Sequence, residues 1–235
     1  MTQYVEDFDD GPGGWMRVVD NHSPVAALPI RDGAVRCQGP WWVDYNHAPP
    51  GGGYLQLLMC LVTRGAAGEA MRDVAGPNRF VAGGYPTDFT NARITLRLRG
   101  EVEAAGTRLT VLLQGAVDGI CSGWALTGDT FAVTPDHTEQ TVTCVPDQSR
   151  WTSLGSRHDR TDTYGEKPFL RVLQDVSINL HLLMFPVMPR PMGRIGGDPH
   201  LLRAGRDYPI WPSSIGQGYV EVDRVRIDFP TGASA

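Results

Sequence analysis

Turn-forming residues interrupt this chain at short intervals, and this spacing limits the fold more than any other feature of the sequence. The pairs Asp32-Gly33, Ala105-Gly106, Pro135-Asp136 and Pro146-Asp147 each lie between extended segments. Turn signals at intervals of roughly 8–12 residues are typical of a β-sandwich, in which many short strands run back and forth. We therefore expect an all-β protein.

The segments between the turns have the residue patterns of strands. Residues 93–99 alternate strictly between polar and apolar side chains, as a strand with one buried face does. Residues 54–62 form a continuous apolar run, which predicts a buried strand. Residues 65–76 allow one short helix. No repeat or linker divides the chain, so we predict one domain over residues 1–235. We expect a β-sandwich of two antiparallel sheets, with long loops and at most one or two short helices; the resemblance described below implies that the sandwich is a jelly roll.

The composition narrows the classes of partner and compartment. The chain has 235 residues, of which 41% are hydrophobic, enough to bury a core without disulfides or metal. A net charge of −5 argues against a nucleic-acid partner. No apolar run approaches the roughly 18 residues of a membrane helix, and the first residues do not resemble a secretory signal. The four cysteines form no C-x-x-C pair, which argues against zinc. We expect a cytoplasmic protein with reduced thiols and no membrane partner; its oligomeric state stays open.

Residues 40–54 contain the densest group of chemically useful side chains in the chain. Trp42, Asp44, Asn46 and His47 precede a Pro-Pro-Gly-Gly-Gly run, which predicts a loop. Asp44 and His47 would act as general acid and base. Trp42 would stack on a ligand and Asn46 would hydrogen-bond to it. The alternative interpretation is a buried aromatic hinge whose polar groups are satisfied by local turn bonds.

Strand parity predicts a polar face on one side of the sandwich. If Leu96 and Leu98 face the core, the arginines between and after them face away, and the same holds for the residue that follows Leu180. The predicted set on one concave face is Arg97, Arg99, Gln114, Asn179 and His181. These side chains suit hydroxyl and carboxylate groups, because they offer forked donors, amides and an imidazole. The alternative is ordinary sandwich alternation with solvated arginines.

Large apolar residues share the parity of this polar face. Leu112, Leu183 and Phe185 would be exposed on a fully solvated face, so we expect the face to be partly covered, by residues 40–54 or 186–206. Trp124 or Trp42 would then stack on a sugar ring.

The two ends of the chain carry a resemblance to known proteins. The residues Glu6-Asp7-Phe8-Asp9-Asp10-Gly11, followed by Trp15, resemble the opening strand of galactose-binding-like carbohydrate-binding modules. Residues 219–227 look like their closing strand. The concanavalin-like jelly rolls of lectins, glucanases and polysaccharide lyases are an equal alternative. The resemblance implies a carbohydrate ligand, and first and last strands that lie together.

In such modules the paired end strands often surround a structural calcium. The resemblance places Asp9 and Asp223 as its ligands, since calcium prefers oxygen donors. The alternative is that both carboxylates cap turns and face solvent.

None of the strong catalytic signatures is present. We predict a carbohydrate-active protein, a hydrolase or a lyase, with Asp44, His47 and His181 as catalytic residues and without a required cofactor. A hydrolase needs two carboxylates. A lyase needs a His or Tyr base beside a carboxylate that an arginine such as Arg97 neutralises. The alternatives are a non-catalytic, lectin-like binding module and a β-sandwich that docks a protein partner.

Overall fold

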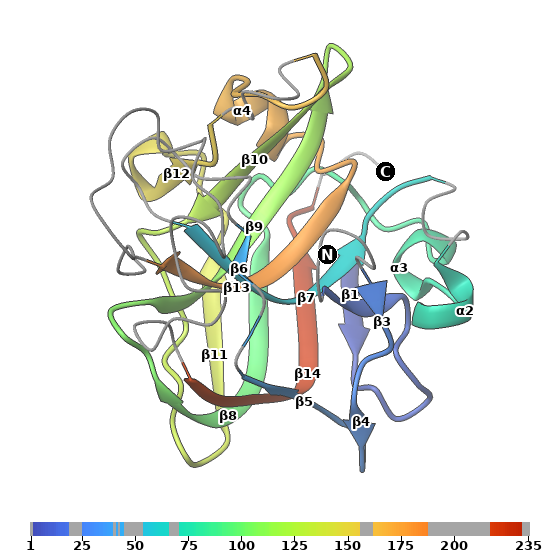
Figure 1. The fold of residues 1–235 in the computed structure, drawn as a ribbon. Coiled ribbons are helices and arrows are strands. Elements are labelled where there is room, and N and C mark those ends of the chain that lie inside the picture. The colour runs from blue at the N-terminus through green and yellow to red at the C-terminus, as the bar shows by residue number, and fades with distance from the viewer. Residues whose placement is uncertain are drawn as a thin grey trace.

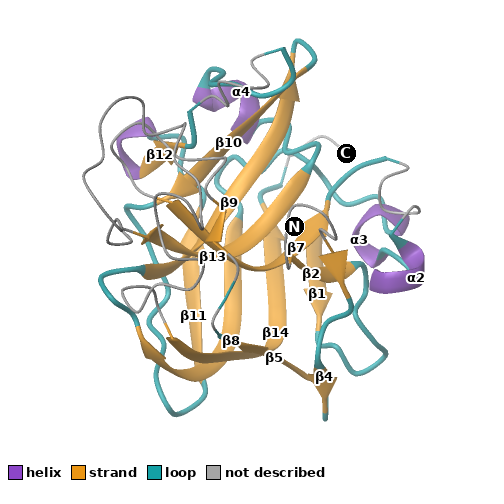
Figure 2. Cartoon of the chain, in the orientation of Figure 1, coloured by secondary structure: helices purple, strands orange, loops and turns teal. Residues whose placement is uncertain are grey.

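Two antiparallel sheets face each other in this computed structural model (Figures 1 and 2). The structure describes residues 2–18, 25–39, 41, 43–44, 54–65, 71–155, 162–187 and 217–231. The predicted fold class, an all-β sandwich of two antiparallel sheets, is confirmed.

Sheet A contains six described strands in the order β11-β8-β14-β5-β4, with β1 also paired to β14. Its strands are β1 (Thr2–Glu6), β4 (Ile30–Arg31), β5 (Ala34–Gln38), β8 (Arg93–Glu103), β11 (Thr138–Thr143) and β14 (Gln217–Phe229). The long strand β14 lies at the centre, because β8 covers one of its edges while β1 and β5 share the other. The first and last described strands therefore lie side by side, as expected from the resemblance.

Sheet B contains eight described strands in the order β12-β10-β9-β13-β7-β2-β3, with β6 also paired to β7. Its strands are β2 (Trp15–Val18), β3 (Val25–Ala26), β6 (Val43–Asp44), β7 (Tyr54–Val62), β9 (Arg108–Val117), β10 (Ile120–Leu126), β12 (Trp151–Ser153) and β13 (Asn179–Val187). The strand β13 pairs with both β9 and β7, so its side chains lie in the middle of the sheet.

The core lies between the sheets and follows the predicted parity. Ile94, Leu96 and Leu98 of β8 are at most 2% exposed and pack in one cluster with Leu180 and Leu182 of β13. Alternation works here because successive side chains on a strand point to opposite faces. The hairpin β4–β5 also forms as expected. Asp32 and Gly33 have φ angles of 51° and 71°, which suit a two-residue hairpin turn.

Helices are short and lie outside the two sheets (Figure 2). The described helices are α2 (Arg72–Ala75), α3 (Arg79–Ala82) and α4 (Phe169–Leu173), with a 3-10 turn η1 (Gln148–Arg150). The helix α2 falls within the stretch where one was expected. The structure thus describes three short helices where at most two were expected, and α3 and α4 lie outside the stretch in which a helix was predicted.

The turn after β1 is built around a buried carboxylate. Glu6 is 0% exposed, accepts a hydrogen bond from the backbone N–H of Phe8 and lies 2.7 Å from Nη1 of Arg79 in α3. Arg79 also donates to the carbonyl of Asp10. Burial is the main cause that raises the pKa of Glu6 above its ordinary value, against the Phe8 hydrogen bond and the Arg79 charge. Gly13 passes so close that a Cβ there would lie 1.7 Å from Glu6 Oε2.

Candidate functional site

The outer face of sheet B, which points away from the inter-sheet core, combines a buried apolar patch with a polar cluster. The apolar patch consists of Leu55, Leu57, Leu112, Ala125, Leu154, Leu183 and Phe185. All seven side chains are at most 6% exposed. The prediction that Leu112, Leu183 and Phe185 are covered is therefore confirmed. The segments expected to cover them lie largely outside the described residues.

The polar cluster consists of Gln114, Tyr164, Asn179 and His181, and Gln114 is at its centre. Its Oε1 lies 2.9 Å from Nε2 of His181 and accepts a hydrogen bond of 3.2 Å from Asn179. Its Nε2 donates a hydrogen bond of 2.8 Å to the phenol oxygen of Tyr164. Gln114 and His181 are 8% and 7% exposed, and Asn179 is partly exposed. Three of the five residues predicted on one polar face therefore meet.

Backbone register brings these side chains together. Asn179 of β13 lies opposite Gln114 of β9, and His181 is two residues further along β13 on the same face. The phenol of Tyr164 reaches the cluster from the segment between β12 and α4, where Tyr164 forms an isolated parallel bridge with Cys121 of β10. Gly123 makes room for it, because a Cβ at Gly123 would lie 3.0 Å from the phenol oxygen.

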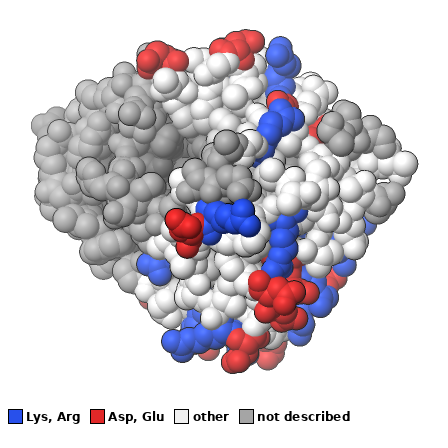
Figure 3. All heavy atoms as spheres, turned by 90° about the vertical axis from the view of Figure 1, so that its right-hand side faces the viewer, with Lys and Arg blue, Asp and Glu red and all other residues white. Residues whose placement is uncertain are grey.

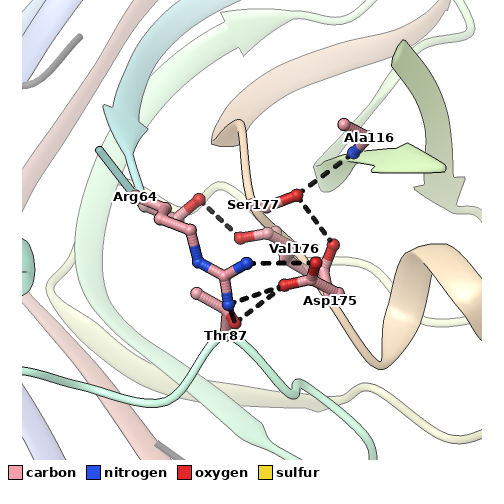
Figure 4. Close-up of polar contacts among 7 residues, drawn as sticks. Arg64, Thr87, Ala116, Asp175, Val176 and Ser177 are labelled. Carbon is pink, nitrogen blue, oxygen red and sulfur yellow. Dashed lines mark hydrogen bonds and ion pairs between the residues drawn. The ribbon is translucent and has the colours of Figure 1, made fainter. Parts of the chain in front are cut away.

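A hydrogen-bonded clamp holds the start of β13 in this register (Figure 4). Arg64, just after β7, contacts both carboxylate oxygens of Asp175 at 2.9 and 3.1 Å and donates to Thr87 Oγ1 at 2.6 Å. Ser177 Oγ accepts a hydrogen bond from the N–H of Ala116, at the end of β9. The clamp thus ties the segment before Asn179 to both neighbouring strands.

Arg97 and Arg99 do not belong to this cluster. They lie on β8 of sheet A, and their side chains alternate with Leu96 and Leu98, so they point out of the opposite side of the sandwich. Nε of Arg99 is 2.7 Å from Oε1 of Glu221, and Nη1 of Arg97 is 3.2 Å from Oδ2 of Asp223. The expectation that the arginines share one face with His181 is therefore wrong.

Trp124 does not lie on a binding surface. The side chain is 4% exposed, belongs to the inter-sheet core and packs edge-on against Phe169. Its indole N–H donates to the carbonyl of Lys167. The prediction that Trp124 stacks on a sugar ring is therefore wrong, because β10 turns this residue inward.

The backbone of Asp44 is distant from His181. Asp44 pairs with Leu55 of β7, whereas His181 pairs with Cys60 of the same strand. Five residues of a β-strand span about 15 Å, and β6 lies on the far edge of β7 from β13. The backbone positions of Asp44 and His181 are therefore too far apart to suit one directly hydrogen-bonded site, and the side chain of Asp44 lies outside the described residues. Trp42, Asn46 and His47 lie outside the described residues.

Asp9 and Asp223 have different surroundings. Asp9 is exposed in the turn after β1, where its backbone N–H donates to the side chain of Asp7. Asp223 lies at a bulge of β14 beside Arg97. Within the described ranges, no group of three or more His, Cys, Asp or Glu side chains could hold a metal ion. The calcium ion stays a prediction.

The cavity at one end of the sandwich and the four cysteines offer fewer reactive groups than the polar cluster. A cavity of about 320 Å³ lies at one end of the sandwich, lined mainly by apolar residues such as Leu109, Phe131 and Met184. All four cysteines are free thiols, as expected. Burial raises the pKa of the Cys37 and Cys121 thiols to about 12, so the reactive thiolate is scarce at neutral pH.

Charge is mixed over the described surface. On the face shown in Figure 3, acidic and basic side chains lie beside one another and are not separated into areas of one sign. Among the helices that the structure describes, none is long and apolar enough to span a membrane.

Tyr164 is the member of the cluster that sequence reasoning missed. It stands in a polar stretch between two turns, with no alternation that would assign it to a face. No protein-family model matches the chain, and comparisons with curated proteins and with solved structures find no match. The candidate site therefore stands on its own geometry.

Proposed function

We propose that this chain is a carbohydrate-active protein whose ligand binds over the outer face of sheet B, at the polar cluster. The observation that carries the proposal is the set of hydrogen bonds from one amide, Gln114, to a phenol, an imidazole and a second amide. A phenol and an imidazole can give and take protons. The amides offer donors and acceptors for sugar hydroxyl or carboxylate groups.

The cluster suits an elimination reaction better than hydrolysis. Glycoside hydrolysis uses two carboxylates that flank the bond, and the four strands around the cluster, β7, β9, β10 and β13, contain no Asp or Glu. In β-elimination, a base takes the proton from the carbon beside a uronate carboxylate. The electron pair forms a carbon–carbon double bond, the bond to the glycosidic oxygen breaks, and an acid protonates that oxygen. His181 and Tyr164 supply the base and the acid. The substrate class is a uronate-containing glycan.

The surroundings of the cluster support this chemistry. The apolar patch beside it excludes water from one side, and a low local dielectric strengthens hydrogen bonds and charge interactions. The clamp of Arg64 and Asp175 holds β13 in place, so Asn179 and His181 are positioned before a ligand arrives. Asn179 is the partly exposed member and would contact the substrate carboxylate.

The test compares two histidine variants on a panel of uronate polysaccharides, neutral polysaccharides and aryl glycosides. Elimination creates an unsaturated uronate that absorbs ultraviolet light, and hydrolysis does not. We expect the wild type to produce this signal and His181→Ala to lose it by a factor of roughly 10²–10⁴, the usual contribution of an acid–base group. The matched control is His137→Ala, because His137 lies beside Glu221 and Asp223 on the opposite sheet.

The outcome of this assay distinguishes a lyase from a hydrolase, a lectin-like module and a protein-docking sandwich. Release of aryl groups without an unsaturated product would favour a hydrolase. Binding of a glycan without turnover, measured by calorimetry, would favour a lectin-like module. That reading draws support from the low exposure of Gln114 and His181. Neither binding nor turnover on the whole panel would overturn the proposal and favour a protein-docking sandwich. The free thiols fit a cytoplasmic location.

A further inference from the structure

Gln114 has three hydrogen-bond partners, and the chemistry of its amide determines which atom donates in each of the three bonds. An amide oxygen only accepts hydrogen bonds and an amide nitrogen only donates them. Oε1 of Gln114 faces Nδ2 of Asn179 at 3.2 Å and Nε2 of His181 at 2.9 Å. Nε2 of Gln114 faces the phenol oxygen of Tyr164 at 2.8 Å. In this orientation, the ring nitrogen of His181 next to Gln114 must carry a hydrogen.

We propose that Gln114 is a positioning residue that fixes neutral His181 in the tautomer with hydrogen on Nε2 and makes Nδ1 its proton acceptor. The tautomer of His181 is inferred from the hydrogen bonds of the polar cluster alone. The catalytic use of Nδ1 rests on the proposed function. A neutral imidazole carries one hydrogen, so a hydrogen on Nε2 leaves the lone pair on Nδ1.

Gln114 has the opposite hydrogen-bonding role at Tyr164, where it donates instead of accepting. Because the phenol oxygen accepts a hydrogen bond from Gln114, the phenol hydrogen points to another acceptor. One glutamine thus makes the imidazole a proton acceptor at Nδ1 and the phenol a proton donor. In the elimination proposed above, His181 takes the proton from carbon and Tyr164 gives its proton to the leaving oxygen. The substrate's electron pair ends in the new double bond, and proton return from imidazolium to phenolate resets the site.

The alternative to this proposal is the same set of hydrogen bonds with every donor and acceptor exchanged. If the amides of Gln114 and Asn179 both turned over, Gln114 would donate to Nε2 of His181 and accept from Tyr164. The hydrogen of His181 would then sit on Nδ1. A single spectroscopic observation on the wild type therefore decides between the two directions, without any substrate.

The experiment is ¹⁵N–¹H correlation spectroscopy of the imidazole rings in full-length protein labelled at histidine, at a pH of about 8.5, where ordinary imidazoles are neutral. The His181 signals are those missing from His181→Ala. In the wild-type protein, we expect the His181 signals to show the pattern of a neutral imidazole with hydrogen on Nε2. A pattern of hydrogen on Nδ1, or an even mixture of the two tautomers, would overturn the proposal.

Two substitutions at Gln114 test its role as a positioning residue. Gln114→Leu removes both oxygen and nitrogen, so His181 should change from a single tautomer to the mixture of an unconstrained imidazole, in which hydrogen on Nε2 only predominates. Gln114→Glu keeps an acceptor opposite Nε2, so the preference should return, and the titration of His181 should move to higher pH by roughly one unit or more beside the new charge. Gln140→Leu is the control. Gln140 lies on β11 of sheet A and bonds to the backbone of Ala132 through both amide atoms, so its loss should leave His181 unchanged.

The outcomes separate this inference from the proposed function. An unchanged tautomer in Gln114→Leu would show that another group positions His181, even if the enzyme turns over glycans. The expected tautomer in a protein that turns over nothing would leave Gln114 as a positioning residue of a binding site. If Gln114→Leu lost the dispersed amide spectrum of a folded protein, the wild-type tautomer and Gln114→Glu would still decide.

Discussion

At the scale of single residues, the buried carboxylate of Glu6 limits which amino acids can occupy the positions beside it. It lies against Gly13, whose φ angle is +59°, and it is held by Arg79 at 2.7 Å. An ionised group without exposure is tolerated only when its partners stay in place. The glycine-rich turn after β1 is therefore a packing requirement as well as a turn signal.

Gly13→Ala should destabilise the protein strongly. Its Cβ would meet Glu6 Oε2 at 1.7 Å. Moving Glu6 aside would disturb an ion pair between a buried carboxylate and a half-exposed arginine, for which the cost of about 3–5 kcal/mol of a fully buried pair is an upper bound. Gly11→Ala is the matched control, because Gly11 also has a positive φ but has open space around it. It should cost about 1–3 kcal/mol, for the backbone conformation alone. Urea unfolding measures both, and equal losses would mean that backbone strain alone matters.

Glu6→Gln should reveal a pH-dependent cost of the buried carboxylate. The pKa of Glu6 is raised in the folded state, chiefly by burial, so the folded protein holds this proton more tightly than the unfolded chain. Its contribution to stability is full below the unfolded pKa near 4.5 and is lost as the pH rises through the folded value. Relative to Glu6→Gln, the wild type should therefore lose stability as the pH rises above about 4.5.

The measurement for Glu6 is the difference between the two unfolding free energies, taken from urea titrations at several pH values. Other carboxylates titrate in both proteins, so their effects cancel. A difference that grew in favour of the wild type with rising pH would mean that the ion pair with Arg79 outweighs burial.

At the scale of elements, Asn78 joins a short helix to a central strand. Its Oδ1 accepts a hydrogen bond from the N–H of Val81, which caps α3, and its Nδ2 donates to the carbonyl of Val62 at the end of β7. Asn78 is 4% exposed. A four-residue helix cannot be stable alone, so this side chain and the contacts of Phe80 hold α3 in place.

Asn78→Ala should cost about 2–4 kcal/mol, because it removes a cap worth about 1 kcal/mol and leaves a buried carbonyl without its donor, at about 1–3 kcal/mol. The comparison is Asp147→Ala, an exposed cap of η1 that accepts from the N–H of Ser149. That variant should lose clearly less stability, because the capped N–H of Ser149 can bond to water instead. Chemical denaturation of both proteins tests the difference, and similar losses would mean that the bond to Val62 contributes nothing.

Strand parity explains why part of the fold and of the site could be predicted. Leu96, Leu98, Leu180 and Leu182 face the core as expected, because alternation within a strand is a local property. The same rule placed Asn179 and His181 on an outer face.

Parity cannot say which sheet a strand joins, because pairing depends on contacts between distant segments. Arg97 and Gln114 have the same outward parity and lie on opposite sides of the sandwich. Trp124 faces the core on β10, and residues 120–126 show no clean polar–apolar alternation that would assign this side chain to a face. Tyr164 reaches Gln114 through one backbone bridge, which leaves no periodic signal in the sequence.

At the scale of the whole molecule, sheet A depends on its last strand. The strand β14 hydrogen-bonds to β1, β5 and β8, and its apolar face contributes Val220, Val222, Val225, Ile227 and Phe229, all 0% exposed.

Ending the chain after residue 216 should therefore abolish cooperative folding, because three strands lose their common partner. Ending it after residue 231 keeps every described strand and should preserve a sharp thermal transition. Circular dichroism and binding of a hydrophobic dye check both truncations. A sharp transition in the shorter one would mean that sheet B folds independently of β14.

The central place of β14 also sets the order in which this protein can mature during synthesis. Ribosomes add roughly 5–20 residues per second, so β1, β5 and β8 leave the ribosome on the order of ten seconds before their shared partner. Until then their edges offer unpaired N–H and C=O groups to any neighbouring chain. Sheet B has all of its described strands earlier, but its core face has nothing to pack against. Growing chains on the same messenger are thus most prone to associate just before β14 emerges, and chaperones that bind extended segments would act on this protein at that stage.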